Sequence, residues 1–264
     1  MNIGVCIKLV PASDTRITIS NPSGVDESVY SKPNINPYDE YALEEAVRLR
    51  DKGGAEKVFV FSFDNSKNAK KQIINALARG ADEAILIQDP ALDGSDCLGV
   101  ARVLSAAIKN EGVEMVFCGR QAIDGDNAQI APMLAELLDW AQVSSIAKLE
   151  IDGDNFKAWR DIGGGNKGIV EGNKPVVFSC DKGLNEPRFV KLKERIAAKK
   201  KPLRVVDLSE LGVDADTVGS QGALVEEFNW GLPPKRAECK FLEGDAKSAV
   251  NQLVHLLRTE AKVL

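Results

Sequence analysis

The chain has 264 residues, of which 44% are hydrophobic and 28% are charged, and its formal net charge at pH 7 is −5. These values predict a soluble globular protein that binds no nucleic acid and does not insert into a membrane, because no apolar run approaches the roughly 20 residues that cross a bilayer. The one histidine, His255, argues against a Ser-His-Asp triad and a His/Cys metal site, so no catalytic residue and no metal site is expected.

The five cysteines form no C-x-x-C pair. Cys6, Cys118 and Cys180 lie in or beside apolar runs, where a free thiol behaves as a small hydrophobic group. The N-terminal segment goes directly into an apolar run, without a basic leader or a small-residue cleavage site. These features predict reduced thiols in a bacterial cytoplasm.

Apolar runs alternate with helical patterns through the first two-thirds of the chain. The expected strands are Ile3–Val10, Val58–Phe63, Ala84–Ile87 and Met115–Cys118. The expected helices cover 40–52, 68–81, 97–112 and 128–140. Asn36 and Pro37 should cap the first helix, and Gly53 should end it. The alternation predicts an α/β fold with a doubly wound, mostly parallel sheet.

The pattern changes after Trp140. Four runs joined by turns predict further strands at Ile146–Ile151, Asn155–Ile162, Gly168–Glu171 and Pro175–Cys180. Residues 205–244 have few core signals and precede a last expected helix, Asp245–Lys262. We therefore expect three regions: a nucleotide-binding α/β domain (1–183), a partner-recognition segment (184–204) and an extended arm that lies along another subunit (205–264).

The recognition segment is strongly cationic. Residues 188–201 hold seven lysines and arginines against one acid, Glu194. On an acidic chain, such a segment indicates a docking site for a partner with a negative surface. An ordinary amphipathic surface helix with solvated lysines is the alternative.

Apolar residues of this segment follow a helical spacing. Phe189, Leu192 and Ile196 occur at i, i+3 and i+7, which predicts one stripe of a short helix. Asn185 is expected to cap that helix, and Pro187 fits its first turn.

Three loops that follow expected strands and precede expected helices predict a nucleotide pocket. They are 119–132, 34–39 and 63–66. Parallel strands end at one edge of a sheet, where helix N-termini can bind phosphate. A long capped loop without a ligand is the alternative. No P-loop accompanies these loops, so the nucleotide is expected to be a structural ligand.

Side chains of the 119–132 loop suggest separate roles. Asp124 and Asp126 would repel a phosphate and are expected to cap the helix or to bind ribose hydroxyls. Gln121 and Gln129 offer neutral donors, and Gly119 lets the backbone approach closely. Residues 163–168 match G-x-G-x-x-G, but strand patterns on both sides predict a hairpin turn.

Four segments resemble the β subunit of the electron-transfer flavoprotein family: NPYDEYALEEAVRL (36–49), GADEA (80–84), GRQAIDGDNAQ (119–129) and LNEPRFVKLKERIAAKKK (184–201). The resemblance implies a fold of the adenine-nucleotide α-hydrolase (HUP-like) type and a subunit that is not an enzyme by itself. It implies a heterodimer in which the α subunit holds most of the electron-carrying FAD, while the β subunit binds AMP. Electrons would pass from acyl-CoA or related dehydrogenases to a membrane-bound quinone oxidoreductase.

The resemblance also implies site residues. The nucleotide contacts would be Cys6, Asn36, Pro37, Tyr38, Asp39, Phe63, Gly119, Arg120, Gln121, Ala122, Ile123, Asp124, Gly125, Asp126, Asn127, Ala128, Gln129 and Ile130. Leu192 would be the anchor in a dehydrogenase pocket, and the residues around it would be Phe189, Ile196, Lys193 and Arg195. Asp161 would face the mobile flavin domain.

Two features of the loop leave the nucleotide open. Ile130 lacks the hydroxyl of the Thr found in many AMP-binding members, and residues 119–130 resemble electron-bifurcating relatives, in which the adenosine half of a second FAD occupies this site. In contrast, 184–188 resemble the non-bifurcating type, and Ala12-Ser13-Asp14 departs from the VPDT loop common in bifurcating members. AMP with a single electron-carrying FAD is the leading interpretation.

Two other classes remain as alternatives. A stand-alone adenine-nucleotide enzyme of the same fold would need an S-G-G-x-[DS] loop after the first strand, and residues 8–13 offer none. A small nucleotide-binding stress protein would leave the cationic segment and residues 205–264 without a role.

Overall fold

The computed structural model describes residues 1–21, 24–66, 68–236 and 238–264. The chain divides into two compact units, Met1–Trp230 and Gly231–Leu264. The sites predicted from the sequence lie in the first unit.

A nine-stranded sheet forms the centre of the first unit, in the order β11-β5-β4-β1-β6-β10-β7-β8-β9. Its strands are β1 (Asn2–Cys6), β4 (Lys57–Phe63), β5 (Glu83–Ile87), β6 (Val113–Gly119), β7 (Ala141–Asp152), β8 (Asn155–Asp161), β9 (Lys167–Asn173), β10 (Val176–Cys180) and β11 (Leu203–Val206). Neighbours from β11 to β7 pair in parallel, and β8 and β9 extend the sheet in antiparallel pairs. The predicted α/β fold with a mostly parallel sheet is confirmed.

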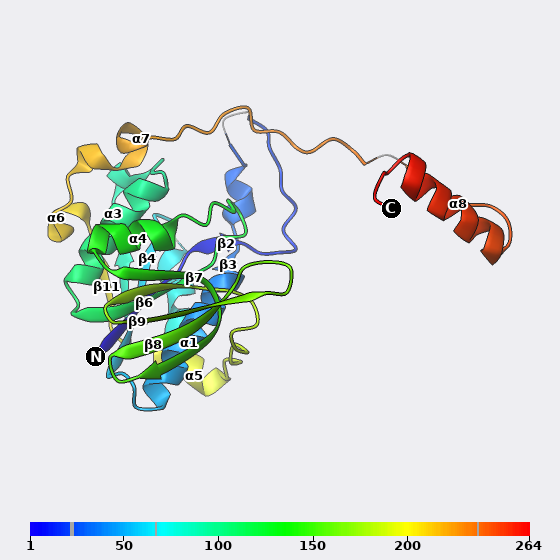
Figure 1. The fold of residues 1–264 in the computed structure, drawn as a ribbon. Coiled ribbons are helices and arrows are strands. Elements are labelled where there is room, and N and C mark those ends of the chain that lie inside the picture. Colours follow the sequence, from blue (N-terminus) through cyan, green and yellow to red (C-terminus); the bar gives the residue numbers. More distant parts are fainter. Residues whose placement is uncertain (22–23, 67, 237) are drawn as a thin grey trace. The chain divides into compact units, whose positions relative to one another are not determined.

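Helices cover both faces of this sheet (Figure 1). α1 (Pro37–Asp51) and α2 (Ala69–Ala78) pack with one core cluster, and α3 (Cys97–Lys109) and α4 (Ile130–Leu138) pack with the other. Strand β4 serves both clusters, because its side chains alternate: Val60 points to the α1 face and Phe61 to the α3 face. Fully burying one such side chain contributes about 1.5–3 kcal/mol.

The sequence predicted one strand over Ile3–Val10, but the structure divides this run into two strands. β1 ends at Cys6, and β2 (Leu9–Pro11) pairs in antiparallel fashion with β3 (Pro33–Ile35) in a separate two-stranded sheet. The chain bends at Lys8, whose backbone N–H donates to a buried carboxylate on α1 instead of continuing the ladder. A short 3-10 helix, Glu27–Tyr30, precedes β3.

The expected arm boundary at residue 205 also differs from the structure. β11 pairs with β5 at the sheet edge, and α6 (Leu208–Leu211), a 3-10 turn (Ala215–Thr217) and α7 (Gly219–Gly222) follow it. Val206, Leu208 and Val218 are buried in the α3-side cluster. The sequence pattern missed this region because each of its elements has only three or four residues.

The second unit contains α8 (Ala246–Thr259), which is shorter than the expected helix to Lys262. The Asp245 carboxylate caps it by accepting from the Ser248 N–H at 2.8 Å. No described residue of α8 is buried within the chain, although Val250 and Leu253 are large and apolar. Among the described residues, no helix is long and apolar enough to cross a membrane.

The β8–β9 connection is the predicted hairpin turn. Gly163, Gly164 and Gly165 have positive φ angles, and no helix follows them. The G-x-G-x-x-G match therefore lacks the strand–helix setting of a dinucleotide site.

Candidate nucleotide site and docking segment

Three of the predicted nucleotide contacts stand at the ends of neighbouring strands. Cys6 ends β1, Phe63 ends β4 and Gly119 ends β6, and β1 lies between the other two strands. Cys6 and Cys118 are buried, and the hydrogen bond to Cys6 together with burial raises the pKa of the Cys118 thiol well above its ordinary value. The Cys118 thiol is therefore neutral, and both buried side chains pack as small apolar groups.

Asp39 is the central polar group of this edge. Its buried carboxylate accepts hydrogen bonds from the Lys8 N–H at 2.7 Å, the Asn36 side-chain amide at 2.9 Å and the Gly119 N–H at 3.1 Å. Burial raises the pKa of Asp39 from 3.8 to about 7, against the lowering effect of these donors. Asp39 thus joins the ends of β1, β3 and β6, and its oxygens already have three protein donors.

Asn36 holds the 119–129 loop in place. Its side-chain amide donates to the Gln121 carbonyl at 2.8 Å, and its side-chain oxygen accepts from the Ile123 N–H at 3.2 Å. Asn36 stands at the N-cap position of α1, as predicted, but its side chain makes no capping hydrogen bond to the helix. Its backbone carbonyl accepts the first helical hydrogen bonds from Asp39 and Glu40 instead.

Gly119 is a glycine because α1 approaches it closely. A Cβ at this position would lie 2.2 Å from an Asp39 carboxylate oxygen and 2.8 Å from backbone atoms of Tyr38 and Asp39. The close approach predicted from the sequence is therefore made by the chain's own helix.

The acids of the loop do not cap α4, contrary to the expectation. Asp124 forms an ion pair with Lys8 at 2.8 Å and accepts a 3.4 Å hydrogen bond from the Tyr30 hydroxyl. Asp126 accepts from the Gln121 side-chain amide at 2.7 Å, so this predicted donor is also engaged. The ion pair with Lys8 reduces the repulsion that Asp124 would exert on a phosphate.

The N-terminus of α4 has the geometry of an anion site. The helix begins at Ile130, and Gln129 at its N-cap makes no side-chain capping hydrogen bond. The first backbone N–H groups of a helix lack intrahelical acceptors and favour phosphate. Ala128, just before this turn, has a φ of +54°, which costs about 1–2 kcal/mol for a residue with a Cβ. The helix starts with the N–H groups of Ile130 and Ala131, because its third residue, Pro132, carries no N–H.

The third loop, 63–66, binds the segment that follows β5. The Asn65 side-chain amide donates to the Asp89 carbonyl at 2.8 Å and to the Asp93 carboxylate at 2.6 Å. Phe63, the predicted nucleotide contact from this loop, is half-buried at the end of β4 and remains available to a ligand. Arg120 is likewise engaged, in an ion pair with Asp181 at 2.9 Å.

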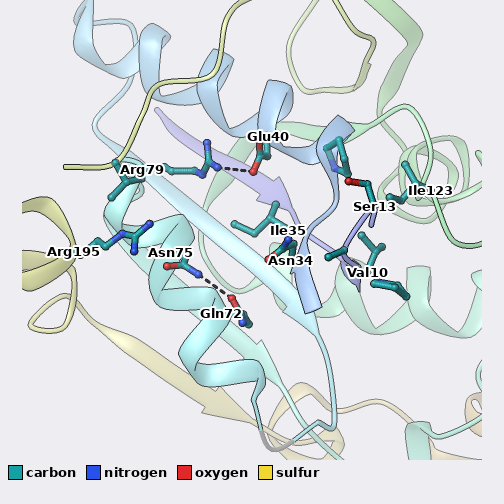
Figure 2. A pocket seen from close by; sticks show the side chains of 14 residues that line it. Val10, Ser13, Asn34, Ile35, Glu40, Gln72, Asn75, Arg79, Ile123 and Arg195 are labelled. Carbon is teal, nitrogen blue, oxygen red and sulfur yellow. Dashed lines mark hydrogen bonds and ion pairs between the residues drawn. The ribbon is translucent and has the colours of Figure 1, made fainter. Parts of the chain in front are cut away.

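Two cavities lie next to these loops. One of about 310 Å³ is lined by β2, β3, α1, α2 and two residues of the recognition segment, and the other is about 410 Å³. Of the predicted nucleotide contacts, Pro37 lines both cavities and Ile123 lines the first. Figure 2 shows the first cavity, with Gln72 and Asn75 from α2 opposite β3. No sequence signal pointed to Gln72, Asn75 or Arg79, because they belong to an ordinary amphipathic helix and its C-cap.

Residues 184–191 do not begin a helix, contrary to the prediction. Asn185 donates to the Tyr41 carbonyl and to Glu45, both at 2.9 Å, so it is not a helix cap. Arg188 binds the buried Glu44 through its backbone N–H and two guanidinium nitrogens, at 2.8–3.1 Å. These contacts fix an extended segment, which includes Pro187, along α1.

The helix of this segment is α5 (Leu192–Ala198). The Glu194 carboxylate accepts from the Lys191 N–H at 2.6 Å and caps its start. Buried Ala198 packs it on α2. Leu192 and Ile196 of the predicted stripe lie on the helix, and Phe189 precedes it. Phe189, Leu192 and Ile196 are 95%, 74% and 57% exposed.

Asp161 lies at the end of β8 and is exposed. It forms an ion pair with Lys167 at 2.9 Å and accepts from the Gly163 N–H at 2.8 Å. The hydrogen bond from Lys167 lowers the pKa of Asp161 below its ordinary value. The carboxylate is therefore charged and stays at the base of the β8–β9 hairpin.

Comparison with known proteins decides the family. The family model "Electron transfer flavoprotein domain" matches residues 29–211. The chain is 37% identical to the electron transfer flavoprotein subunit beta of Bacillus subtilis over 100% of both chains. This chain belongs to the electron transfer flavoprotein family, as a β-subunit member.

Further relatives of the electron transfer flavoprotein family are similar over nearly the whole chain. The subunit beta of Thermoanaerobacterium thermosaccharolyticum is 39% identical over 98% of both chains. A protein of Anaerotignum propionicum named acryloyl-CoA reductase electron transfer subunit gamma is 33% identical over 97% of this chain and 98% of its own. The resemblance predicted from the four sequence segments is confirmed, and the family's role is electron transfer.

Proposed function

We propose that this chain pairs with an α subunit in a heterodimeric electron carrier and does no bond-making chemistry itself. The α subunit would hold most of one FAD, which supplies reversible electron uptake and release when bound. Similarity to β subunits over the full chain supports this proposal. The exposed apolar residues of α8 and the acid Asp161 on the β8–β9 hairpin are the surfaces we assign to the α subunit.

The proposed electron donor is an acyl-CoA or related dehydrogenase, as in fatty acid β-oxidation, and the proposed acceptor is a membrane-bound quinone oxidoreductase. The relative named as a subunit of an acryloyl-CoA reductase supports a redox partner that acts on CoA thioesters. This chain's own contribution is to bind that partner and to hold the flavin domain within reach.

The observation that carries the docking role is the exposure of Leu192. Leu192 is 74% exposed between Phe189 and Ile196, so its side chain gains little from packing within this chain. An exposed apolar cluster of this kind indicates an interaction surface. The segment before it is fixed by the Arg188–Glu44 contacts, so docking would order few residues. Burying Leu192 in a partner pocket would contribute about 1.5–3 kcal/mol. Lys193 and Arg195 beside it would speed encounter with an acidic partner.

For the nucleotide, we propose AMP at the N-terminus of α4, with the phosphate at the N–H groups of Ile130 and Ala131 and the base towards Phe63 and Cys6. The uncapped helix start, the positive φ of Ala128 and the neutralised Asp124 support an anionic ligand there. The adenosine half of a second FAD is the alternative, because it presents the same phosphate chemistry.

The docking proposal is tested with Leu192→Ala in the co-expressed heterodimer. FAD reduction is measured anaerobically with an acyl-CoA dehydrogenase and butyryl-CoA as the electron source. We expect kcat/KM for the heterodimer to fall about 10- to 100-fold, from the lost burial, at unchanged FAD content. Lys199→Ala on the same segment is the control and should stay within about threefold. Unchanged reduction of the Leu192 variant would refute the anchor.

The nucleotide proposal is tested by extracting the purified heterodimer and quantifying its nucleotides. One FAD and one AMP per heterodimer is the expected result. Two FAD would establish the alternative, an electron-bifurcating flavoprotein, and would leave the docking proposal untouched.

A further inference from the structure

The two cavities beside α2 form one polar recess next to the docking residues. They share Pro37, Glu40, Arg79, Val190 and Arg195. Phe189 lines the second cavity and is 95% exposed, so the recess begins where the apolar docking surface ends. At about 310 and 410 Å³ the cavities hold far more than one water, which takes about 30 Å³.

The charges around the recess leave one cation without a partner. Arg79 binds Glu40 at 2.5 Å, and Arg188 binds Glu44 and Asp51. The Arg195 side chain makes no hydrogen bond or ion pair with any residue that the structure describes. The acid of the recess, Glu40, is already used by Arg79, so the recess as a whole is positive.

Neutral amides add hydrogen-bonding capacity opposite Arg195. The Asn75 side-chain amide donates to the Gln72 side-chain oxygen at 2.8 Å, which leaves the amide nitrogen of Gln72 available to an acceptor. Figure 2 shows Arg195 extending from α5 towards this pair on α2. An unpaired guanidinium facing amide donors is suited to a carboxylate, which accepts two parallel hydrogen bonds from arginine.

We propose that this recess binds an acidic side chain, a Glu or Asp, of the redox partner whose apolar pocket receives Leu192. The inference rests on the proposed docking function and adds a determinant of partner choice to it. Leu192 supplies an apolar anchor that many pockets could accept. Arg195 requires a carboxylate at a fixed place beside that pocket, because a partner without one would bury the guanidinium unpaired.

The test does not require the natural partner. The probe is N-acetylglutamate amide, which carries a single side-chain carboxylate, titrated into the heterodimer with isotope-labelled Ile and Val methyl groups. Ile35, Ile123, Val10 and Val190 line the recess and report on it. We expect saturable shifts of these methyls, at least tenfold weaker binding in Arg195→Gln, and unchanged binding in Lys199→Ala and Leu192→Ala.

Two results would overturn the inference: no saturable shift in the unmodified heterodimer, or equal binding in Arg195→Gln. Neither depends on electron transfer, so they are distinct from failure of the docking proposal, which the Leu192 variant tests. N-acetylglutamine amide, which replaces only the carboxylate by a neutral amide, is the ligand control and should cause no saturable shift. Binding that survives the loss of the carboxylate would also refute a site for an acid.

Discussion

Asp39 offers a direct test of how the nucleotide edge is held together. The pKa of its buried carboxyl is raised from 3.8 to about 7, which corresponds to roughly 4 kcal/mol between the two protonation states. Since the folded state binds the proton more tightly, stability from this group is fully present below pH 3.8 and is lost as pH rises to about 7. The ionised carboxylate is then held by its three N–H donors.

Asp39→Asn removes the charge and one acceptor oxygen together. With its remaining oxygen on the Asn36 and Gly119 donors, the variant leaves the Lys8 N–H unpaired, which costs about 1–3 kcal/mol. At pH 8 the relief of charge burial, roughly 4 kcal/mol, exceeds this loss. The variant should therefore be at least as stable as the native protein at pH 8, and its relative stability should decrease towards pH 5.

Thermal unfolding of the heterodimer between pH 5 and pH 8 measures the stability of Asp39→Asn relative to the native protein. The difference in Tm between variant and native protein should change by several degrees across the range, since 1 kcal/mol corresponds to about 2–4 °C in chains of this size. Asp14→Asn, which removes an exposed carboxylate, is the control and should show no such trend. A variant that is less stable at pH 8 than at pH 5, relative to the native protein, would refute the reasoning, because the N–H donors would then outweigh burial.

Two further substitutions test contacts of the same helix. Gly119→Ala should lower the free energy of unfolding by about 1–3 kcal/mol or more, measured by thermal unfolding, because its Cβ would overlap Asp39; Gly231→Ala, in open space, should be neutral. Arg188→Gln should speed amide hydrogen exchange across 185–191, because it leaves Glu44 buried without its guanidinium partner.

The glycine prediction fails if the two alanine variants unfold at the same temperature. The Arg188 prediction fails if exchange across 185–191 is unchanged, since the segment would then be fixed by other contacts.

The parallel sheet could be predicted from the sequence because its strands are continuous apolar runs, such as Val58–Phe63. Such a run identifies a strand even when the strands that pair with it are unknown. β11 could not, because its four residues become a strand only where β5 offers an open edge. The same holds for Lys8 and Tyr30, which meet Asp124 across more than ninety residues of chain. Resemblance to a family located the loop, but the contacts that use its acids arise from tertiary structure.

Asn36 and Asn185 show how contacts between distant segments override a local sequence rule. The sequence rule assigns each side chain to a helix start, but only Asn36 stands at an N-cap, since α5 begins at Leu192, seven residues after Asn185. In the structure, both side chains bind other segments, 121–123 and the Tyr41 carbonyl. A local rule identifies an amide that needs partners, but a distant segment with free backbone groups can supply them equally well.

Helix α1 connects the two proposed functions. Its first turn carries Asp39, which fixes the start of the nucleotide loop, and its middle carries Glu44 and Glu45, which fix the docking segment. A helix advances about 1.5 Å per residue, so the two sets of contacts lie within roughly 10 Å along one rigid element. The geometry between the proposed nucleotide site and the proposed docking segment is thereby set by a single helix. A substitution that displaces α1, such as Gly119→Ala, should therefore disturb both sites, whereas Leu192→Ala should affect docking alone.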